Sequence, residues 1–393
     1  MRMKMLISVV LVAAMVGCSS TNRQKTQREA AQKQWNGARA GVLYSLAKDQ
    51  YATGNFDKAR QTVDEALKMD PSNAPLHLLG AKLAIEQGQL ERAEIDLKEA
   101  EKLNPKDAEA EYLLGVVYQR WQKSQLALDY YLKASDKAPA ELAYIMARAE
   151  MLVAMDRQKE ALSLLQEKVV YFEHSPVIRD AVGQLLMQMG RPGEAVDMFR
   201  QASILANDDL SLREHLALAQ YANKQYSDAL DTLGRLMGDN NYAKRVDLLI
   251  AQGECQLQTG RVRDARDTFE SASQIVPASA TVWLGVAKSA LKLGDARRAE
   301  MSLRKAISLD AASSESQLLM GYMRLNQGKI ADALLCFRKA SALDPNDPVS
   351  LCMIGLALEK QGHSQQAVEC YAKALKIKPG DELATRLMAS MQE

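Results

Sequence analysis

Histidine and cysteine side chains are the groups in this chain that are best suited to bind a metal or attack a substrate. The four histidines are His77, His174, His215 and His363. No two of them lie three or four residues apart, the spacing that places two ligands on one helical face, so the sequence predicts no zinc site. The chain also lacks a glycine-rich phosphate loop and a Gly-x-Ser-x-Gly motif around a nucleophilic serine. We therefore expect no catalytic residue, no metal site and no cofactor.

One cysteine, Cys18, follows a segment with the composition of an export signal. After a short basic stretch, Met5–Val16 is an apolar run of 12 residues, which is too short to span a bilayer. With Gly17 before the cysteine, residues 1–17 resemble the signal peptide of bacterial lipoproteins, in which Cys18 becomes the lipidated first residue. Ser19 in place of aspartate implies, by the same resemblance, an outer-membrane lipoprotein that faces the periplasm. The alternative is a buried N-terminal helix with an incidental cysteine.

The next segment, residues 18–39, is polar and mainly basic. Its charged residues are Arg23, Lys25, Arg28, Lys33 and Arg39 against Glu29. We expect a tether between the lipid anchor and the rest of the chain, with helix formation from Gln24 to Trp35. A basic segment beside a lipid anchor can also contact anionic lipid headgroups.

The composition of the whole chain is that of a folded globular protein. Of its 393 residues, 47% are hydrophobic and 25% are charged, and the formal net charge is +1. This balance excludes extensive disorder and a generally basic nucleic-acid-binding protein. No apolar run of about 18 residues follows residue 17, which excludes a polytopic membrane protein.

A period of 34 residues runs through the chain from about residue 40. Its marker alanines are Ala59, Ala93, Ala127, Ala161, Ala195, Ala229, Ala265, Ala299, Ala333 and Ala367. Eight of the nine intervals between them are 34 residues long, and one is 36. Seven repeats have glycine five residues before the marker alanine, eight have a second alanine seven residues after it, and six close with proline. Such a period indicates stacked copies of one supersecondary unit.

The residues of a repeat identify its family. The third repeat contains Leu114-Gly115, Tyr118, Ala127, Tyr131, Ala134 and Pro139. This pattern resembles the tetratricopeptide repeat family, in which each repeat is a pair of antiparallel helices. The resemblance covers residues 40–381 and implies an all-α, right-handed superhelical solenoid of about ten helix-turn-helix units with a C-terminal capping helix.

Two of the repeats depart from the pattern. Repeat 4 has Asp156 and Lys168, and repeat 6 has Lys224 and Leu236, where regular repeats have the glycine and the second alanine. The turn-forming segment 238–241 and two extra residues follow repeat 6, which favours a hinge near 237–246. The expected parts are repeats 1–6 over 40–236, a turn or hinge over 237–245, repeats 7–10 over 246–381 and the capping helix over 382–393.

Four cysteines lie in the array, at Cys255, Cys336, Cys352 and Cys370. A periplasmic location would permit disulfides. Cys336 and Cys370 hold equivalent places in adjacent repeats, about one helix diameter or roughly 10 Å apart, which is too far for a disulfide. We expect free thiols that act as small apolar side chains.

The family resemblance also implies a partner-binding groove. In this family the first helix of each repeat lines the concave surface, and five of its places face the partner. Carried over to this chain, the groove residues include Tyr44, Lys48, Tyr51, Lys82, Tyr112, Arg120, Gln184, Tyr221, Glu254, Lys288, Tyr322 and Asn326. Tyrosines among apolar and charged side chains suit an extended peptide or an amphipathic helix. The alternative is that the apolar members pack between repeats.

These observations predict a non-enzymatic scaffold that is anchored to the outer membrane and binds protein partners in the periplasm. Among similar lipoproteins, assembly of pili or secretion systems is the first expectation. The alternatives are a structural scaffold of exopolysaccharide export and an adaptor for peptidoglycan enzymes. An enzyme would need convergent titratable groups, for which Glu254 and Lys288 are the candidate pair. We expect the membrane to be contacted through the lipid anchor, and expect neither nucleic acid nor a small-molecule substrate.

Overall fold

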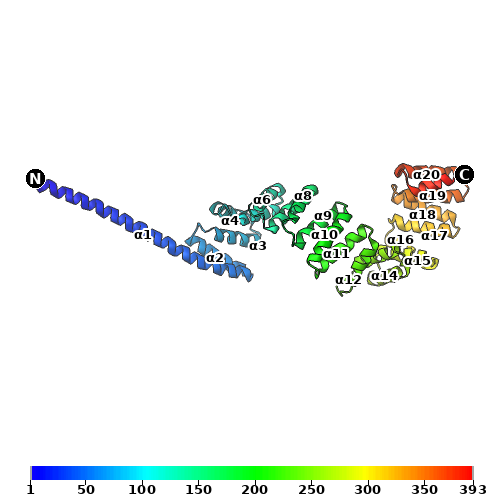
Figure 1. Ribbon diagram of the computed structural model, residues 1–393, viewed down its shortest axis with the longest axis horizontal. Coiled ribbons are helices and arrows are strands. Elements are labelled where there is room, and N and C mark those ends of the chain that lie inside the picture. The colour runs from blue at the N-terminus through cyan, green and yellow to red at the C-terminus, as the bar shows by residue number, and fades with distance from the viewer. Residues whose placement is uncertain (1, 392–393) are drawn as a thin grey trace. The chain divides into compact units, whose positions relative to one another are not determined.

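The computed structural model describes the backbone of residues 2–391 and the side chains of residues 24–391. Within this range the chain forms 21 α-helices and no β-strand (Figure 1). Two compact units, Met1–Glu173 and His174–Glu393, are each described by themselves. The side chains of the predicted signal peptide and of Cys18 lie outside the described residues, so lipidation stays a prediction.

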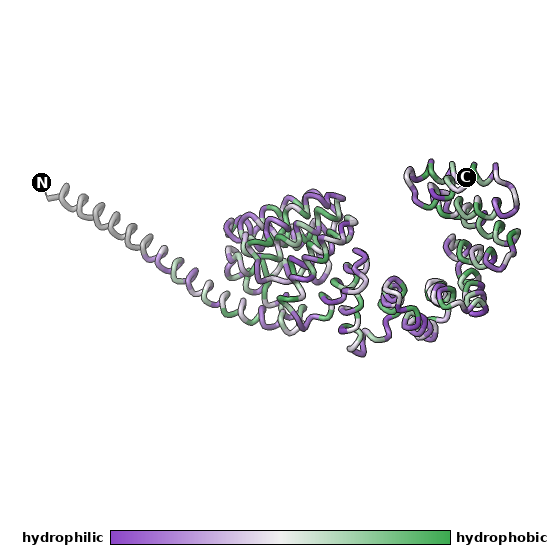
Figure 2. Tube along the Cα trace, turned by 45° about the vertical axis from the view of Figure 1, so that its right-hand side comes forward, coloured by the Kyte–Doolittle hydropathy of each residue, from purple (hydrophilic) through white to green (hydrophobic). Residues whose placement is uncertain are grey.

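Unit 1 holds the first four repeats. Its helices are α1 (Arg2–Ala52), α2 (Phe56–Met69), α3 (Ala74–Glu86), α4 (Leu90–Leu103), α5 (Ala108–Arg120), α6 (Ser124–Lys137), α7 (Leu142–Ala154) and α8 (Gln158–Val169). The odd-numbered helices are the first helices of the repeats, and the even-numbered helices are the second. The long helix α1 runs without a break from the predicted tether into repeat 1. Residues 24–35 of α1 are all exposed, so this part of the expected tether is a solvated helix (Figure 2).

Unit 2 holds repeats 5–10 and a last helix. Its helices are α9 (Pro176–Gln188), α10 (Pro192–Leu205), α11 (Leu210–Ala222), α12 (Tyr226–Leu236), α13 (Val246–Gln258), α14 (Val262–Ile275), α15 (Ala280–Lys292), α16 (Ala296–Leu309), α17 (Ser314–Asn326), α18 (Ile330–Leu343), α19 (Pro348–Lys360), α20 (Ser364–Ile377) and α21 (Glu382–Ser390). In both units each helix packs mainly on its neighbours in sequence, as expected for a stack of helix pairs. The all-α repeat fold predicted from the period is confirmed.

A turn through left-handed backbone separates the two helices of every repeat. In all ten repeats the residue five places before the marker alanine has a positive φ, between 58° and 85°. Seven of these residues are glycine, and the other three are Gln122, Asp156 and Lys224. Glycine adopts this conformation without a steric penalty, whereas another residue costs about 1–2 kcal/mol. Packing of the helix pair therefore imposes the turn even where glycine is missing.

The two helices of a repeat meet where a small residue on the first faces a larger one on the second. Five repeats pair glycine with a ring: Gly115–Tyr131, Gly183–Phe199, Gly253–Phe269, Gly321–Phe337 and Gly355–Tyr371. A Cβ on these glycines would lie 2.4–2.6 Å from the nearest ring atom. The other five hold alanine and an aliphatic residue at the same places: Ala47–Val63, Ala81–Leu97, Ala149–Leu165, Ala217–Leu233 and Ala287–Leu303. Volume removed from one helix is thus restored on the other, which preserves dense packing.

The core follows the helix pairs, and a capping helix closes its C-terminal end. All ten marker alanines are fully buried. Asp381 accepts hydrogen bonds from the backbone N–H groups of Leu383 and Ala384, which begins α21. Leu387 and Met388 of α21 then pack on the last repeat. The predicted C-terminal cap is confirmed for the described residues, and Gln392 and Glu393 lie outside them.

The boundary between compact units differs from the expected hinge. The chain divides after Glu173, whereas the turn-forming segment predicted a division near 237–246. Leu233 and Leu236 before that segment share one buried cluster with Leu248 and Ala251 after it. The extra residues are accommodated beside a continuous core, and motion in this segment stays a prediction.

Candidate functional site

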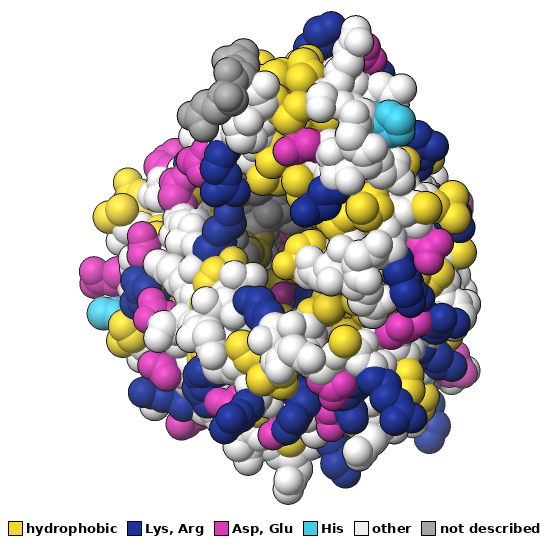
Figure 3. Space-filling view, turned by 90° about the vertical axis from the view of Figure 1, so that its right-hand side faces the viewer, with side chains coloured by type: hydrophobic (Ala, Val, Ile, Leu, Met, Phe, Trp, Pro, Cys, Tyr) yellow, Lys and Arg dark blue, Asp and Glu magenta, His cyan; other side chains and the backbone are white. Residues whose placement is uncertain are grey.

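The first helices of successive repeats form the candidate binding surface, which we call the inner face of each unit. In unit 1, α3 contacts α1 and α5, and in unit 2 the first helices from α9 to α19 contact one another in order. Side chains 34 residues apart on these helices therefore line up in rows. In a view from the C-terminal side, basic, acidic and apolar side chains are mixed over the surface (Figure 3).

At the start of unit 1 the inner face is partly closed by packing. Tyr44 and Tyr51 are half-buried against the core of repeat 1, whereas Lys48 is exposed. The Tyr51 ring lies 5.6 Å from that of Phe56, and burial, together with nearby Glu86, raises the pKa of Tyr51. Lys48 is thus the member of this group that is open to a partner.

Further along unit 1, the predicted groove residues already have partners within the chain. The Nζ atom of Lys82 lies 2.5 Å from Oε1 of Glu109 on the next first helix. Tyr112 stacks on Tyr144 with ring centroids 4.7 Å apart. Arg120 donates a hydrogen bond of 2.7 Å to the carbonyl oxygen of Ile85. These side chains join adjacent repeats, a role that the groove assignment did not include.

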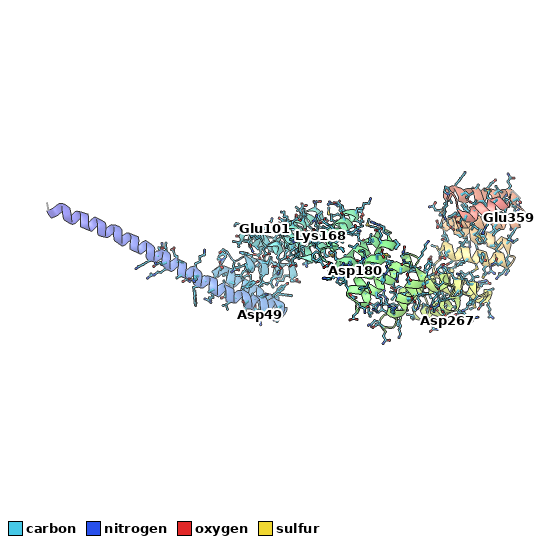
Figure 4. The ribbon with its side chains drawn as sticks, viewed as in Figure 1. Asp49, Glu101, Lys168, Asp180, Asp267 and Glu359 are labelled. Atoms are coloured by element: carbon cyan, nitrogen blue, oxygen red, sulfur yellow. The ribbon has the colours of Figure 1, made fainter. Side chains whose placement is uncertain are left out.

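In unit 2 the inner face begins with a hydrogen-bonded group around Asp180, which is labelled in Figure 4. Gln184 donates to one carboxylate oxygen of Asp180 at 2.7 Å, and Nδ1 of His215 lies 2.7 Å from the other. The hydrogen bond to Asp180 raises the pKa of His215 despite its partial burial. This group ties α9 to α11.

The centre of the inner face of unit 2 carries an ion-pair chain. Nζ of Lys288 lies 3.0 Å from Glu254 of the preceding repeat and 2.9 Å from Glu315 of the following one. Burial would lower the pKa of Lys288, but the two carboxylates raise it above its usual value. A lysine held protonated in this way is a poor general base. Tyr221 is half-buried nearby, and burial and the charge of Glu254 raise its pKa.

The C-terminal part of this inner face is the most open. Tyr322 is 46% exposed and Asn326 is exposed beside it on α17. The nearby acidic residue Glu359 (Figure 4) accepts a hydrogen bond of 3.0 Å from the Tyr371 hydroxyl. An exposed tyrosine with an amide one turn away offers an apolar ring and hydrogen-bonding groups to a partner.

Sequence reasoning missed one class of contact, in which cations bond to the end of a preceding helix. Arg120 and Lys292 hold the same place in their repeats, 34 residues before the equivalent place of the next repeats being applied to both. Lys292 donates to the carbonyl oxygen of Leu257 at 3.1 Å, which matches the bond from Arg120 to Ile85. The last carbonyl groups of a helix lack partners within the helix, so a cation there is stabilising. The shared place in the repeat was the available signal.

The described residues show no group that would support metal chemistry. No cluster of three or more His, Cys, Asp or Glu side chains occurs among residues 24–391. Cys255, Cys336, Cys352 and Cys370 are free thiols. Burial raises the pKa of Cys255 to about 12 and that of Cys352 to about 11, so both thiols are unreactive at neutral pH. No helix in this range has the length and apolar character needed to cross a membrane.

Family profiles match two parts of the chain. Residues 50–117 match the tetratricopeptide repeat profile. Residues 205–393 match the profile of the C-terminal domain of cilia and flagella-associated protein 70. Together the two matches include residues from both units.

Curated relatives match over shorter stretches. The chain is 26% identical over 148 residues to the type IV pilus assembly protein PilF of Pseudomonas aeruginosa, which covers 37% of this chain and 58% of that protein. It is 23% identical over 167 residues to the TPR repeat-containing protein YpiA of Bacillus subtilis, covering 42% and 40% of the two chains. The chain thus spans about half the length of the curated relatives it matches.

A solved structure supports the fold. In the hetero-tetramer of the APC/C proteins Cut9 and Hcn1, a chain aligns with a TM-score of 0.50 and 12% identity. The alignment covers 92% of this chain and 98% of that one. At this identity the similarity concerns the helical repeat fold.

Proposed function

The chain belongs to the tetratricopeptide repeat family, and from this premise we propose that its inner faces bind an extended peptide or a helix of a protein partner. Repeats of this family form scaffolds for protein–protein interaction. The observation that supports the inner face of unit 2 most is the exposure of Tyr322 beside Asn326. Exposed aromatic residues in concave surfaces often supply much of the binding energy.

The ion-pair chain of unit 2 suggests how specificity arises. Lys288 is neutralised by Glu254 and Glu315, so the centre of the face carries fixed charge without a free nucleophile or base. A partner with polar groups in register would bond to these charges, while Tyr322 would pack on an apolar side chain. This arrangement favours a non-enzymatic scaffold.

Two alanine variants of repeat 9 test the proposed surface. Tyr322→Ala removes the inner-face ring from α17, and Leu335→Ala removes a side chain that is 57% exposed on the second helix α18. We expect Tyr322→Ala to weaken partner binding by about 2 kcal/mol or more, and Leu335→Ala to leave it unchanged. Partner recovery after fixation in cells measures the difference, and equal recovery from both variants would contradict the proposal.

We further propose that the chain is a lipoprotein of the outer membrane that acts in the assembly of an envelope machine such as a pilus or secretion system. Support comes from the apolar run before Cys18 and from the 26% identity to a type IV pilus assembly protein. Cys18→Ala should abolish incorporation of labelled fatty acid and release the chain from the membrane fraction. Retention of both properties in this variant would exclude lipidation at Cys18.

A further inference from the structure

The N-terminal end of the array exposes a surface that is buried in later repeats. Val42 and Leu46 on α1 are 70% and 47% exposed. The equivalent residues of repeat 8 are Val282 and Val286, which are buried almost completely. Val282 packs against residues of the preceding repeat, including Leu249. Repeat 1 has no preceding repeat among the described helices, so the same surface is uncovered.

The uncovered surface continues along α1 as a single stripe. At 100° per residue, its members fall within about 60° of one another around the helix. These members are Arg28, Trp35, Arg39, Val42 and Leu46, which we call the N-terminal stripe. Trp35 is 65% exposed, although tryptophan is seldom left so open without a partner.

The charges on the stripe select the kind of partner. Arg28 is exposed, and Arg39 lies 3.9 Å from Glu65 in an ion pair whose two side chains are more than half-exposed. Such a loose pair contributes little and leaves Arg39 available. Lys25 and Lys33 add positive charge to the same part of α1, against Glu29. A second copy of this stripe would therefore meet like charge, which disfavours pairing.

We propose that the N-terminal stripe docks an acidic amphipathic helix of a partner protein. The helix takes the place that a preceding repeat would have, because repeat 8 shows that a helix pair covers this surface. Its apolar residues pack on Val42, Leu46 and Trp35, and its carboxylates pair with Arg28 and Arg39. This surface lies outside the inner face, so the chain has a docking surface that is independent of the groove.

Two synthetic helical peptides with one leucine pattern, one with a glutamate-rich polar face and one with a lysine-rich face, test the proposal on the full chain. We expect the acidic peptide to bind, as measured by fluorescence anisotropy, and Val42→Glu with Leu46→Glu to weaken binding about tenfold or more. Arg28→Glu with Arg39→Glu should reject the acidic peptide and accept the basic one. Ile95→Glu, at a position 69% exposed on α4, is the matched control and should bind like the parent chain.

Several outcomes would overturn the proposal. One is that neither peptide binds, or that charge reversal leaves the peptide preference unchanged. Another is a dimer in sedimentation that Val42→Glu dissociates, which would assign the stripe to a second copy. A third is binding to phosphatidylglycerol vesicles, lost in Arg28→Glu with Arg39→Glu, without binding of the acidic peptide. Circular dichroism of each variant verifies that these exposed substitutions leave the fold intact.

Discussion

The eight regular repeats and the two divergent ones, repeats 4 and 6, build the same helix pair with different second helices. Every regular second helix has 14 residues, whereas α8 has 12 and α12 has 11. In regular repeats the N–H of the residue after the helix donates to the carbonyl of the second alanine. Lys168 and Leu236 replace that alanine in the divergent repeats. Buried apolar residues thus determine that a pair forms, and the second alanine accompanies its full length.

The largest expected effect comes from restoring the alanine where the divergent repeats lost it. Leu236 is fully buried, so Leu236→Ala should leave a cavity and cost about 2–5 kcal/mol of unfolding free energy. Lys168 is partly exposed beside Glu167 and Tyr171, so Lys168→Ala should change stability by less than about 0.5 kcal/mol. Urea denaturation of both variants measures the contrast. A similar effect at the two positions would show that the repeat place, and not local packing, decides.

The next effect concerns the contact between helices. Gly321→Ala in regular repeat 9 would place a Cβ 2.5 Å from the Phe337 ring and should cost about 1–3 kcal/mol. Adding Phe337→Leu creates the alanine–leucine pair that divergent repeat 6 already has at Ala217 and Leu233, and should recover part of the loss. A double-mutant cycle measures the coupling energy. Additive costs would refute the volume matching between the two helices.

A smaller effect is expected at the left-handed turns of the divergent repeats. Asp156 and Lys224 have φ values of 61° and 60°. Asp156→Gly and Lys224→Gly should each stabilise the chain by roughly 0.5–1 kcal/mol, because the relief of strain exceeds the entropy that glycine adds to the unfolded chain. Gly328→Ala, in a regular turn with φ 74°, is the reverse control and should destabilise. Thermal unfolding would contradict this reasoning if all three changes had the same sign.

The smallest effect is a pH dependence in repeat 6. The hydrogen bond to Asp180 raises the pKa of His215 above its ordinary value of 6.5. Its stabilising contribution is therefore complete below about pH 6.5 and is lost as the pH rises through the raised pKa. The parent chain should lose a small part of its stability between pH 6 and 8, and His215→Gln should not. Parallel denaturation curves for the two chains across this range would remove His215 from the account.

Much of the fold could be predicted because the repeat states each feature many times. The marker alanines, the positive-φ turns and the Asp381 cap each follow from local residue types. The division after Glu173 could not be predicted, because turn propensity near 237–246 describes the backbone locally. The packing of Leu233 and Leu236 on Leu248 across that segment depends on distant contacts.

The candidate site was predicted less completely than the fold. The repeat place identifies which residues lie on first helices, so Tyr322 and Asn326 were found. It does not state which side chains are already used within the chain. Arg120 bonds to a helix end and Lys82 to Glu109, and both contacts depend on a neighbouring helix whose side-chain positions the sequence does not give.

The most direct test of the scaffold account is site-specific photocrosslinking in cells, with the photoreactive residue at position 322 or, as the matched control, at position 335. Both side chains are well exposed in the same repeat, one on the first helix and one on the second. We predict that position 322 captures a defined set of proteins that is absent at position 335. Capture of the same proteins at both positions would contradict the claim that the inner face is the binding surface.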